Sequence, residues 1–167
     1  MFRRHGFLLL VVLCAGLNGN TAAQERARIT LEQLNAVGKA LAAQRCPRPV
    51  EVKTTFIRNP NQRDVADEMQ SFDCRSFRVA IYRSLSASPP RELPMSVVLE
   101  GAHPLAAGPW AVGASAAAIR AEFGPPAREF GQSMAYSLDP RRPGRDTLTF
   151  EVGAGIVRAV SWSWDVE

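Results

Sequence analysis

Apolar residues at helical spacing mark the first predicted element of the chain. They recur at intervals of three and four residues, as one face of an amphipathic helix requires, at Leu31, Leu34, Val37 and Leu41. Thr30 precedes the pattern as an N-cap, and Gln33 completes a capping box. Gly38 weakens the helix a little. The pattern therefore predicts a helix over 31–44.

Strand-like segments follow this helix. Residues 50–57 are β-branched and partly alternating, 77–82 alternate between apolar and polar side chains, and 95–99 are again apolar, so each predicts a strand. One helical turn is expected over 65–69. Residues 84–94 are rich in Ser and Pro and predict a loop.

The second half repeats this order of elements. Ser115 caps a predicted helix over 116–123, and Gly124 and two prolines end it. Alternating segments then predict strands over 134–138, 148–152 and 156–164. We expect an α+β fold in which helices pack on one face of antiparallel meander sheets, arranged as tandem αβββ units over 24–104 and 113–167 within a single domain, 24–167.

The register of the last two strands decides which side chains share a face. A three-residue turn at 153–155 would place Val152 opposite Ile156 and Phe150 opposite Arg158, with Trp162 and Trp164 on the same face. Two interpretations stay open. In the first, this face is the core beneath a helix. In the second, Arg158, Trp162 and Trp164 lie on an open sheet face, where Trp and Arg are residue types that anchor interfaces.

The N-terminus has the layout of a secretory signal peptide. Basic residues at 2–5 precede an apolar run at 6–17 and small residues up to Ala23, which predicts cleavage after residue 23 and a periplasmic location. An uncleaved anchor is the first alternative, but the run is short for a membrane span. An outer-membrane lipoprotein attached through Cys14 is the second, but Leu13 stands where a lipoprotein signal has a small residue.

Removal of residues 1–23 changes the charge. Arg3 and Arg4 leave with no acidic residue, so the formal net charge falls from +4 to +2. The remaining cations form no dense patch, which argues against a nucleic-acid partner. Three arginines of the loop after residue 138, Arg141, Arg142 and Arg145, are predicted to be solvated, and they would steer an acidic protein partner.

Two cysteines remain after the predicted cleavage, Cys46 and Cys74. In an oxidising compartment such a pair forms a disulfide, which on the chain-entropy model stabilises the fold by about 3–4 kcal/mol. Two buried free thiols are the alternative. We expect no metal site, because zinc takes about four ligands and the segment after residue 23 has two cysteines and one histidine. No cofactor is expected either.

The C-terminal segment resembles a known family. Gly113-x-Ser115, Ile119, Phe123-Gly124-x-Pro126, Tyr136 and the strand beginning at Gly155 together resemble SmpA/BamE-like envelope proteins and the related β-lactamase-inhibitor-protein-like modules. The resemblance covers 113–167. It implies an exported module in which a small helical unit precedes a meander, and a role in binding or scaffolding.

Candidate catalytic residues are few. His103 is the single histidine after residue 23, and no nucleophile elbow surrounds any serine. We therefore expect a non-catalytic module that binds another envelope or secreted protein, as an inhibitor, an immunity-type protein or an envelope-assembly factor. The alternative is a small periplasmic hydrolase that uses His103 with nearby carboxylates such as Glu100 and Asp73.

Overall fold

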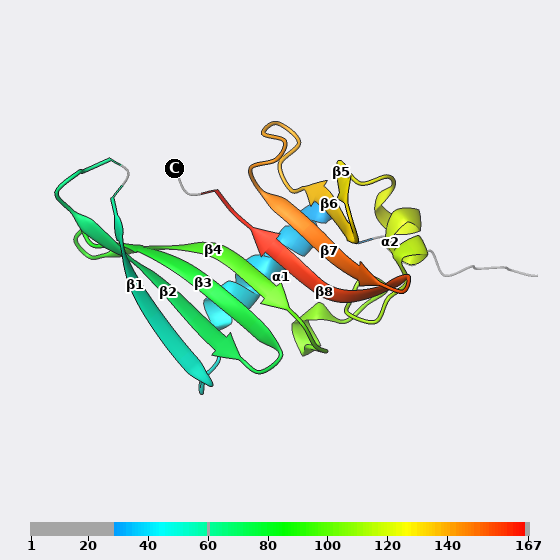
Figure 1. Cartoon of the computed structure of the whole chain (residues 1–167), viewed down its shortest axis with the longest axis horizontal. Coiled ribbons are helices and arrows are strands. Elements are labelled where there is room, and N and C mark those ends of the chain that lie inside the picture. Colours follow the sequence, from blue (N-terminus) through cyan, green and yellow to red (C-terminus); the bar gives the residue numbers. More distant parts are fainter. Residues whose placement is uncertain (1–28, 60, 166–167) are drawn as a thin grey trace, which may run out of the picture.

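One eight-stranded antiparallel sheet dominates the computed structural model, which describes residues 29–59 and 61–165 (Figure 1). The predicted signal peptide, 1–23, and Cys14 lie outside the described residues. The fold is α+β, as predicted, although the sheet outweighs the helices. None of the helices in the described part of the chain has the length and hydropathy needed to cross a membrane.

Each half of the chain contains a helix followed by four strands, one more than predicted. The first half has α1 (Leu31–Gln44), β1 (Glu51–Arg58), β2 (Ala66–Cys74), β3 (Phe77–Ser84) and β4 (Arg91–Leu99). A 3₁₀ turn, η1 (Pro104–Ala106), connects the halves. The second half has α2 (Ala116–Phe123), β5 (Arg128–Phe130), β6 (Ser133–Ser137), β7 (Thr147–Gly153) and β8 (Ile156–Ser163).

The two meanders join edge to edge. The strand order is β1-β2-β3-β4-β8-β7-β6-β5, so the last strand of one meander pairs with the last strand of the other. This junction runs from Ser96 opposite Ser163 to Leu99 opposite Val160. The result is a single sheet with β1 and β5 at its two edges.

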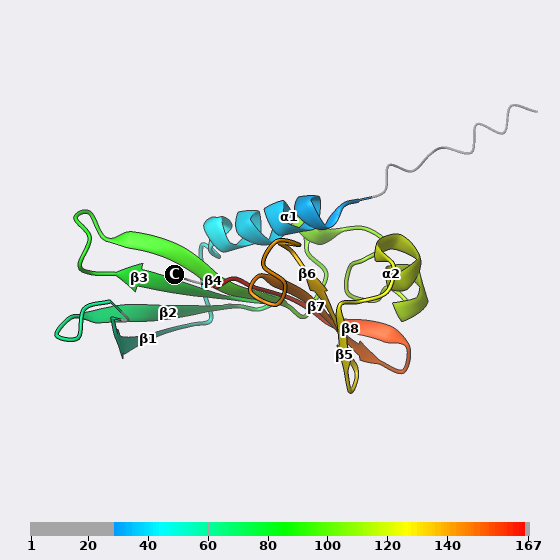
Figure 2. The ribbon, with the colours of Figure 1, turned by 90° about the horizontal axis from the view of Figure 1, so that it is seen from above.

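Both helices cover the same face of this sheet (Figure 2). Leu34 and Leu41 of α1 are fully buried and belong to one core with Trp162 of β8. Phe123 of α2 stacks on Phe150 at a centroid distance of 6.1 Å and meets Tyr136 edge-on at 5.8 Å. The opposite face of the sheet has no helix over it.

The predicted helix signals are confirmed. Thr30 and Gln33 form the reciprocal capping box, with Gln33 N–H donating to Thr30 Oγ1 at 3.1 Å. Ser115 Oγ accepts the Ala118 N–H at 3.1 Å. Gly124 ends α2 with a φ of 77°, a conformation that glycine adopts without steric cost. Both helices therefore begin where their caps predict.

The disulfide is also confirmed. Cys46 and Cys74 are bonded, with a Cα–Cα distance of 5.6 Å. The bond links the segment just after α1 to the end of β2, and so ties the helix to the β1 side of the sheet.

Several boundary predictions are wrong. The segment 65–69 is not a helical turn, because residues 66–69 begin β2, whose backbone pairs with both β1 and β3. The loop over 84–94 ends earlier, because β4 begins at Arg91. Strand β5 was not predicted at all. These segments carry few β-branched residues, and pairing with neighbouring strands, which no local pattern reveals, decides their conformation.

Candidate functional site

The uncovered face of the sheet carries a continuous array of small side chains. Residues directly opposite each other on paired strands point to the same face. Strand register therefore brings together a set of small residues from six strands, which we call the small-residue platform: Ser71, Ala80, Ser96, Ala135, Ser137, Thr147, Thr149, Ser161 and Ser163.

Local sequence explains this array. In β8 the buried Trp162 alternates with Ser161 and Ser163, and in β7 the buried Leu148 alternates with Thr147 and Thr149. The period of two sends each large side chain to the helix-covered face and each hydroxyl to the open face. The platform is thus the reverse side of the core.

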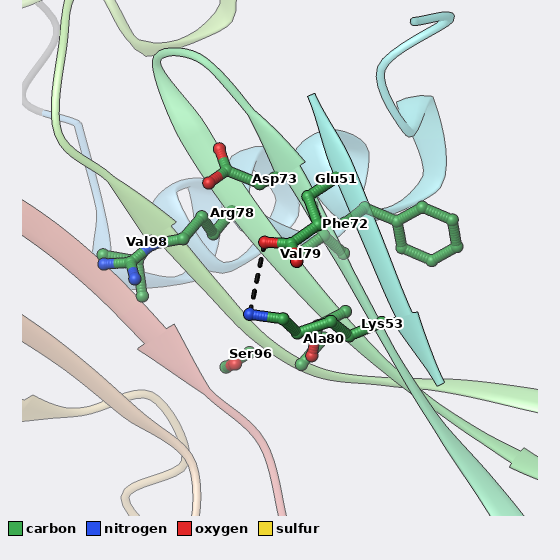
Figure 3. Close-up of a pocket in the computed structure, with 10 residues that line it drawn as sticks. Glu51, Lys53, Phe72, Asp73, Arg78, Val79, Ala80, Ser96 and Val98 are labelled. Carbon is green, nitrogen blue, oxygen red and sulfur yellow. Dashed lines mark ion pairs between the residues drawn. The ribbon is translucent and has the colours of Figure 1, made fainter. Parts of the chain in front are cut away.

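The β1 side of the platform carries charge around a shallow depression of about 370 Å³ (Figure 3). Lys53 Nζ lies 3.2 Å from Glu51 Oε2, and Arg78 pairs with Glu100 at the rim. Asp73 also lines the rim. Opposite charges are interspersed here, so the depression is polar but has no strong field of one sign.

The β5 side of the platform carries an exposed aromatic residue. Phe130 is 84% exposed and stands opposite Ser133, on the same face as the platform. Gly131, with a φ of 58°, turns the chain directly after it. Figure 2 shows this hairpin tip on the side of the sheet away from α1. An aromatic side chain at such a tip is accessible to a partner.

Arg158 also lies on the open face, but the predicted register around it is wrong. Phe150 stands opposite Val160, and a bulge at Arg158 separates the pairs Glu151–Ala159 and Val152–Val157. The shift begins at the turn, which has two residues because Gly153 pairs with Ile156, and it places Arg158 on the face opposite Phe150, where it is exposed. The bulge then shifts the register by one residue more. Its side chain passes close to Gly153, where an added Cβ would lie 3.1 Å from Arg158 Cγ.

Trp162 and Trp164 are buried under α1, so the interpretation that places them in the core holds and the open-sheet interpretation is wrong for both. Trp162 Nε1 donates to the Leu34 carbonyl at 2.9 Å, and Trp164 Nε1 donates to Asn35 Oδ1 at 2.8 Å. The indoles face the helix because β8 lies at the centre of the sheet, where α1 crosses it. They are therefore core residues.

The loop arginines lie apart from Arg158. Asp139 Oδ1 accepts the backbone N–H of Arg141 at 2.9 Å, and Arg142 lies 3.2 Å from Asp139 Oδ2. The backbone hydrogen bond from Arg141 is the main cause that lowers the pKa of Asp139. Arg145 pairs with Asp165 at 3.3 Å. The loop borders α1 residues, so it belongs to the helix-covered side.

His103 caps the 3₁₀ turn. Its Nδ1 accepts the Leu105 N–H at 3.2 Å, and its ring meets Phe77 edge-on at 5.1 Å. Glu100, a predicted acid partner, pairs with Arg78 instead. Within the described ranges no group of His, Cys, Asp or Glu is arranged to hold a metal ion. The contacts that His103 makes are those of a structural cap.

The platform and Phe130 were missed by sequence reasoning. A signal for the platform was present, because serine and threonine alternate with large apolar residues in 133–137, 147–150 and 161–164. No signal marked Phe130, whose exposure depends on the unpredicted strand β5.

Comparison with known proteins identifies no relative of this chain. No family model matches the chain, and no curated protein and no solved structure matches it. The resemblance of 113–167 to SmpA/BamE-like proteins and β-lactamase-inhibitor-protein-like modules stays a prediction.

Proposed function

We propose that this chain is a non-catalytic module of the periplasm that binds another envelope or secreted protein on its open sheet face. The observation that carries the proposal is the small-residue platform, flanked by Phe130 and Arg158 on one side and by paired charges on the other. Inhibition of an enzyme, as in an immunity-type protein, and envelope assembly are both forms of this function.

The chemistry of the face suits protein binding. Serine, threonine and alanine side chains have few rotamers to lose, so a partner orders them at small entropic cost. Their small size lets a partner backbone come close to the sheet. Phe130 supplies apolar area and Arg158 a planar hydrogen-bond donor, and both residue types are enriched in interfaces.

Two features that are typical of exported proteins support a partner in the envelope or in a secreted fraction. The disulfide between Cys46 and Cys74 is typical of an oxidising compartment. The signal-like pattern of residues 1–23 predicts the same route. A partner in the envelope or in a secreted fraction follows from these two features.

The test begins with affinity capture from an envelope extract and continues with the purified partner. We expect Phe130→Ala to weaken binding by about tenfold or more, as loss of an aromatic anchor does. Ser163→Arg should abolish binding, because a long side chain at the centre of the platform blocks close approach. Circular dichroism would verify that both variants fold.

Phe56→Ala is the matched control. Phe56 is also an exposed phenylalanine, at 67%, but it lies on β1 and on the other face of the sheet. It should leave the partner's affinity unchanged. Equal losses for Phe56→Ala and Phe130→Ala, or full binding by Ser163→Arg, would contradict the proposal. A turnover abolished by His103→Ala would instead support the hydrolase alternative.

A further inference from the structure

The two edges of the sheet differ in length. Strand β5 has three residues, whereas β1 has eight and pairs with β2 alone. A long edge strand presents a row of unpaired N–H and C=O groups, which is a template for pairing with another chain. Of the two edges, β1 is therefore the one that offers an extended hydrogen-bonding surface.

The register of β1 decides which of its backbone groups point outward. Asn59 N–H donates to the Val65 carbonyl at 3.0 Å, and the register is constant from Glu51 opposite Asp73 to Arg58 opposite Ala66. Hydrogen-bonded and non-bonded pairs alternate in an antiparallel ladder. Odd-numbered residues of β1 thus bond β2, and the N–H and C=O groups of Val52, Thr54 and Phe56 point to the open edge.

The side chains of the same three residues are also uncovered. Val52 is 50% exposed and Phe56 is 67% exposed, on the face that α1 covers elsewhere. Helix α1 lies over β3, β4 and β8 and leaves β1 bare (Figure 2). The edge therefore has an apolar stripe next to its free hydrogen-bonding groups.

This edge is complementary to itself. An antiparallel pairing centred on Thr54 sets Thr54 opposite Thr54 of the second copy and Val52 opposite Phe56 of the second copy. Val52, Thr54 and Phe56, whose backbone groups point outward, then each stand opposite one of these three residues in the second copy, so their N–H and C=O groups can bond. The side chains of Val52 and Phe56 contact each other across the junction. A lysine on an edge strand opposes pairing with another chain through its charge. Here the charge of Lys53 is paired, because its Nζ lies 3.2 Å from Glu51 Oε2.

We propose that β1 pairs with β1 of a second copy of this chain, antiparallel about Thr54, and joins two eight-stranded sheets into one. The contact involves one strand from each copy, well below a standard interface, so the dimer is weak and concentration-dependent. The symmetry is isologous, which closes the assembly at two copies. Both small-residue platforms stay free, so this inference goes beyond the proposed function and does not depend on it.

Cysteine cross-linking tests the register. Thr54 faces its own counterpart at the two-fold axis, so we expect Thr54→Cys to form an oxidised dimer. Thr55→Cys is the matched control, because Thr55 is also exposed but stands opposite Lys53 of the second copy. We expect at least about tenfold more cross-linked dimer from Thr54→Cys, with the Cys46–Cys74 bond verified by mass spectrometry. Equal yields from both variants would overturn the proposed pairing.

Sedimentation of the unmodified chain gives the second measurement. The mean mass should rise towards that of a dimer with concentration, and Thr54→Pro should abolish the rise by removing an outward N–H, whereas Thr54→Ser should retain it. Proline is tolerated at an edge position whose N–H faces solvent, so Thr54→Pro should fold. A constant monomer mass up to about 1 mM would overturn the proposal. The platform variants Phe130→Ala and Ser163→Arg should dimerise normally, which separates this result from partner binding.

Discussion

Gly38 shows how a single missing side chain sets the position of a helix. It is buried in α1, and a Cβ built on it would lie 2.5 Å from Trp162 Cδ1. The indole therefore rests directly on the helix backbone, where its Nε1 reaches the Leu34 carbonyl. On helix propensity alone Gly38 is unfavourable, but the close approach of Trp162 requires it.

We predict that Gly38→Ala destabilises the protein. Alanine gains about 1 kcal/mol of helix propensity. Overpacking against Trp162 costs about 1–3 kcal/mol, so the free energy of unfolding should fall, as measured by urea denaturation. Ala40→Gly, at an exposed position of the same helix, is the control and should cost about 1 kcal/mol. A more stable Gly38→Ala variant would show that the indole moves away easily.

At the scale of elements, Asp67 holds together the two hairpins of the first meander. It is fully buried in β2, and its carboxylate accepts hydrogen bonds from Asn59 Nδ2 at 2.7 Å, from Leu85 N–H at 2.8 Å and from the Tyr82 hydroxyl. Asn59 in turn accepts from two N–H groups of the β1–β2 loop. One carboxylate thus fixes the loop after β1 and the turn after β3.

The same network predicts a dependence of stability on pH. The hydrogen bond from Tyr82 is the largest cause that lowers the pKa of Asp67 in the folded state below its ordinary 3.8, with further contributions from Leu85 and Asn59 against an opposing effect of burial. The unfolded chain therefore binds this proton more readily. The stabilisation is complete above the unfolded pKa and is lost as the pH falls through the folded pKa.

Asp67→Asn checks this prediction. The variant should be less stable at pH 7, because Asn cannot accept all three hydrogen bonds as a carboxylate does. Its stability should also decline less steeply below about pH 4 than that of the unmodified chain. Urea midpoints measured from pH 7 to pH 3 would give both slopes, and parallel curves would exclude Asp67 as the cause.

At the scale of the whole molecule, one helix and one strand junction bind the halves together. Helix α1 precedes the first meander in the chain, yet Leu34 and Leu41 share a core with Trp162 of the second meander. Strands β4 and β8 add a backbone ladder between the halves. Figure 1 shows α1 behind strands of both meanders.

We therefore predict a single cooperative unfolding transition. Fluorescence reports on the three tryptophans Trp110, Trp162 and Trp164, of which the first two meet edge-on at 6.2 Å in the shared core. Far-ultraviolet circular dichroism reports on all strands. The two signals should give the same urea midpoint. A second transition seen by circular dichroism alone would mean that the first meander unfolds separately.

The amino-acid sequence by itself determined what depends on near neighbours. Helices α1 and α2, their caps and the alternation that buries Leu148 and Trp162 follow from spacing over a few residues. The pairing of Cys46 with Cys74 follows from an even count after the predicted cleavage. Each of these is a local or compositional property, so it can be predicted from the sequence alone.

Only the tertiary structure decided how these elements combine. The β4–β8 junction joins Val97 to Trp162, residues far apart in sequence whose pairing no local pattern encodes. The turn at Ala154 and Gly155 is one residue shorter than predicted and so changed which face Arg158 occupies, and the bulge then shifted the register by one residue more. The platform, the exposed Phe130 and the bare edge of β1 all depend on which strand lies beside which, and that is settled by long-range packing.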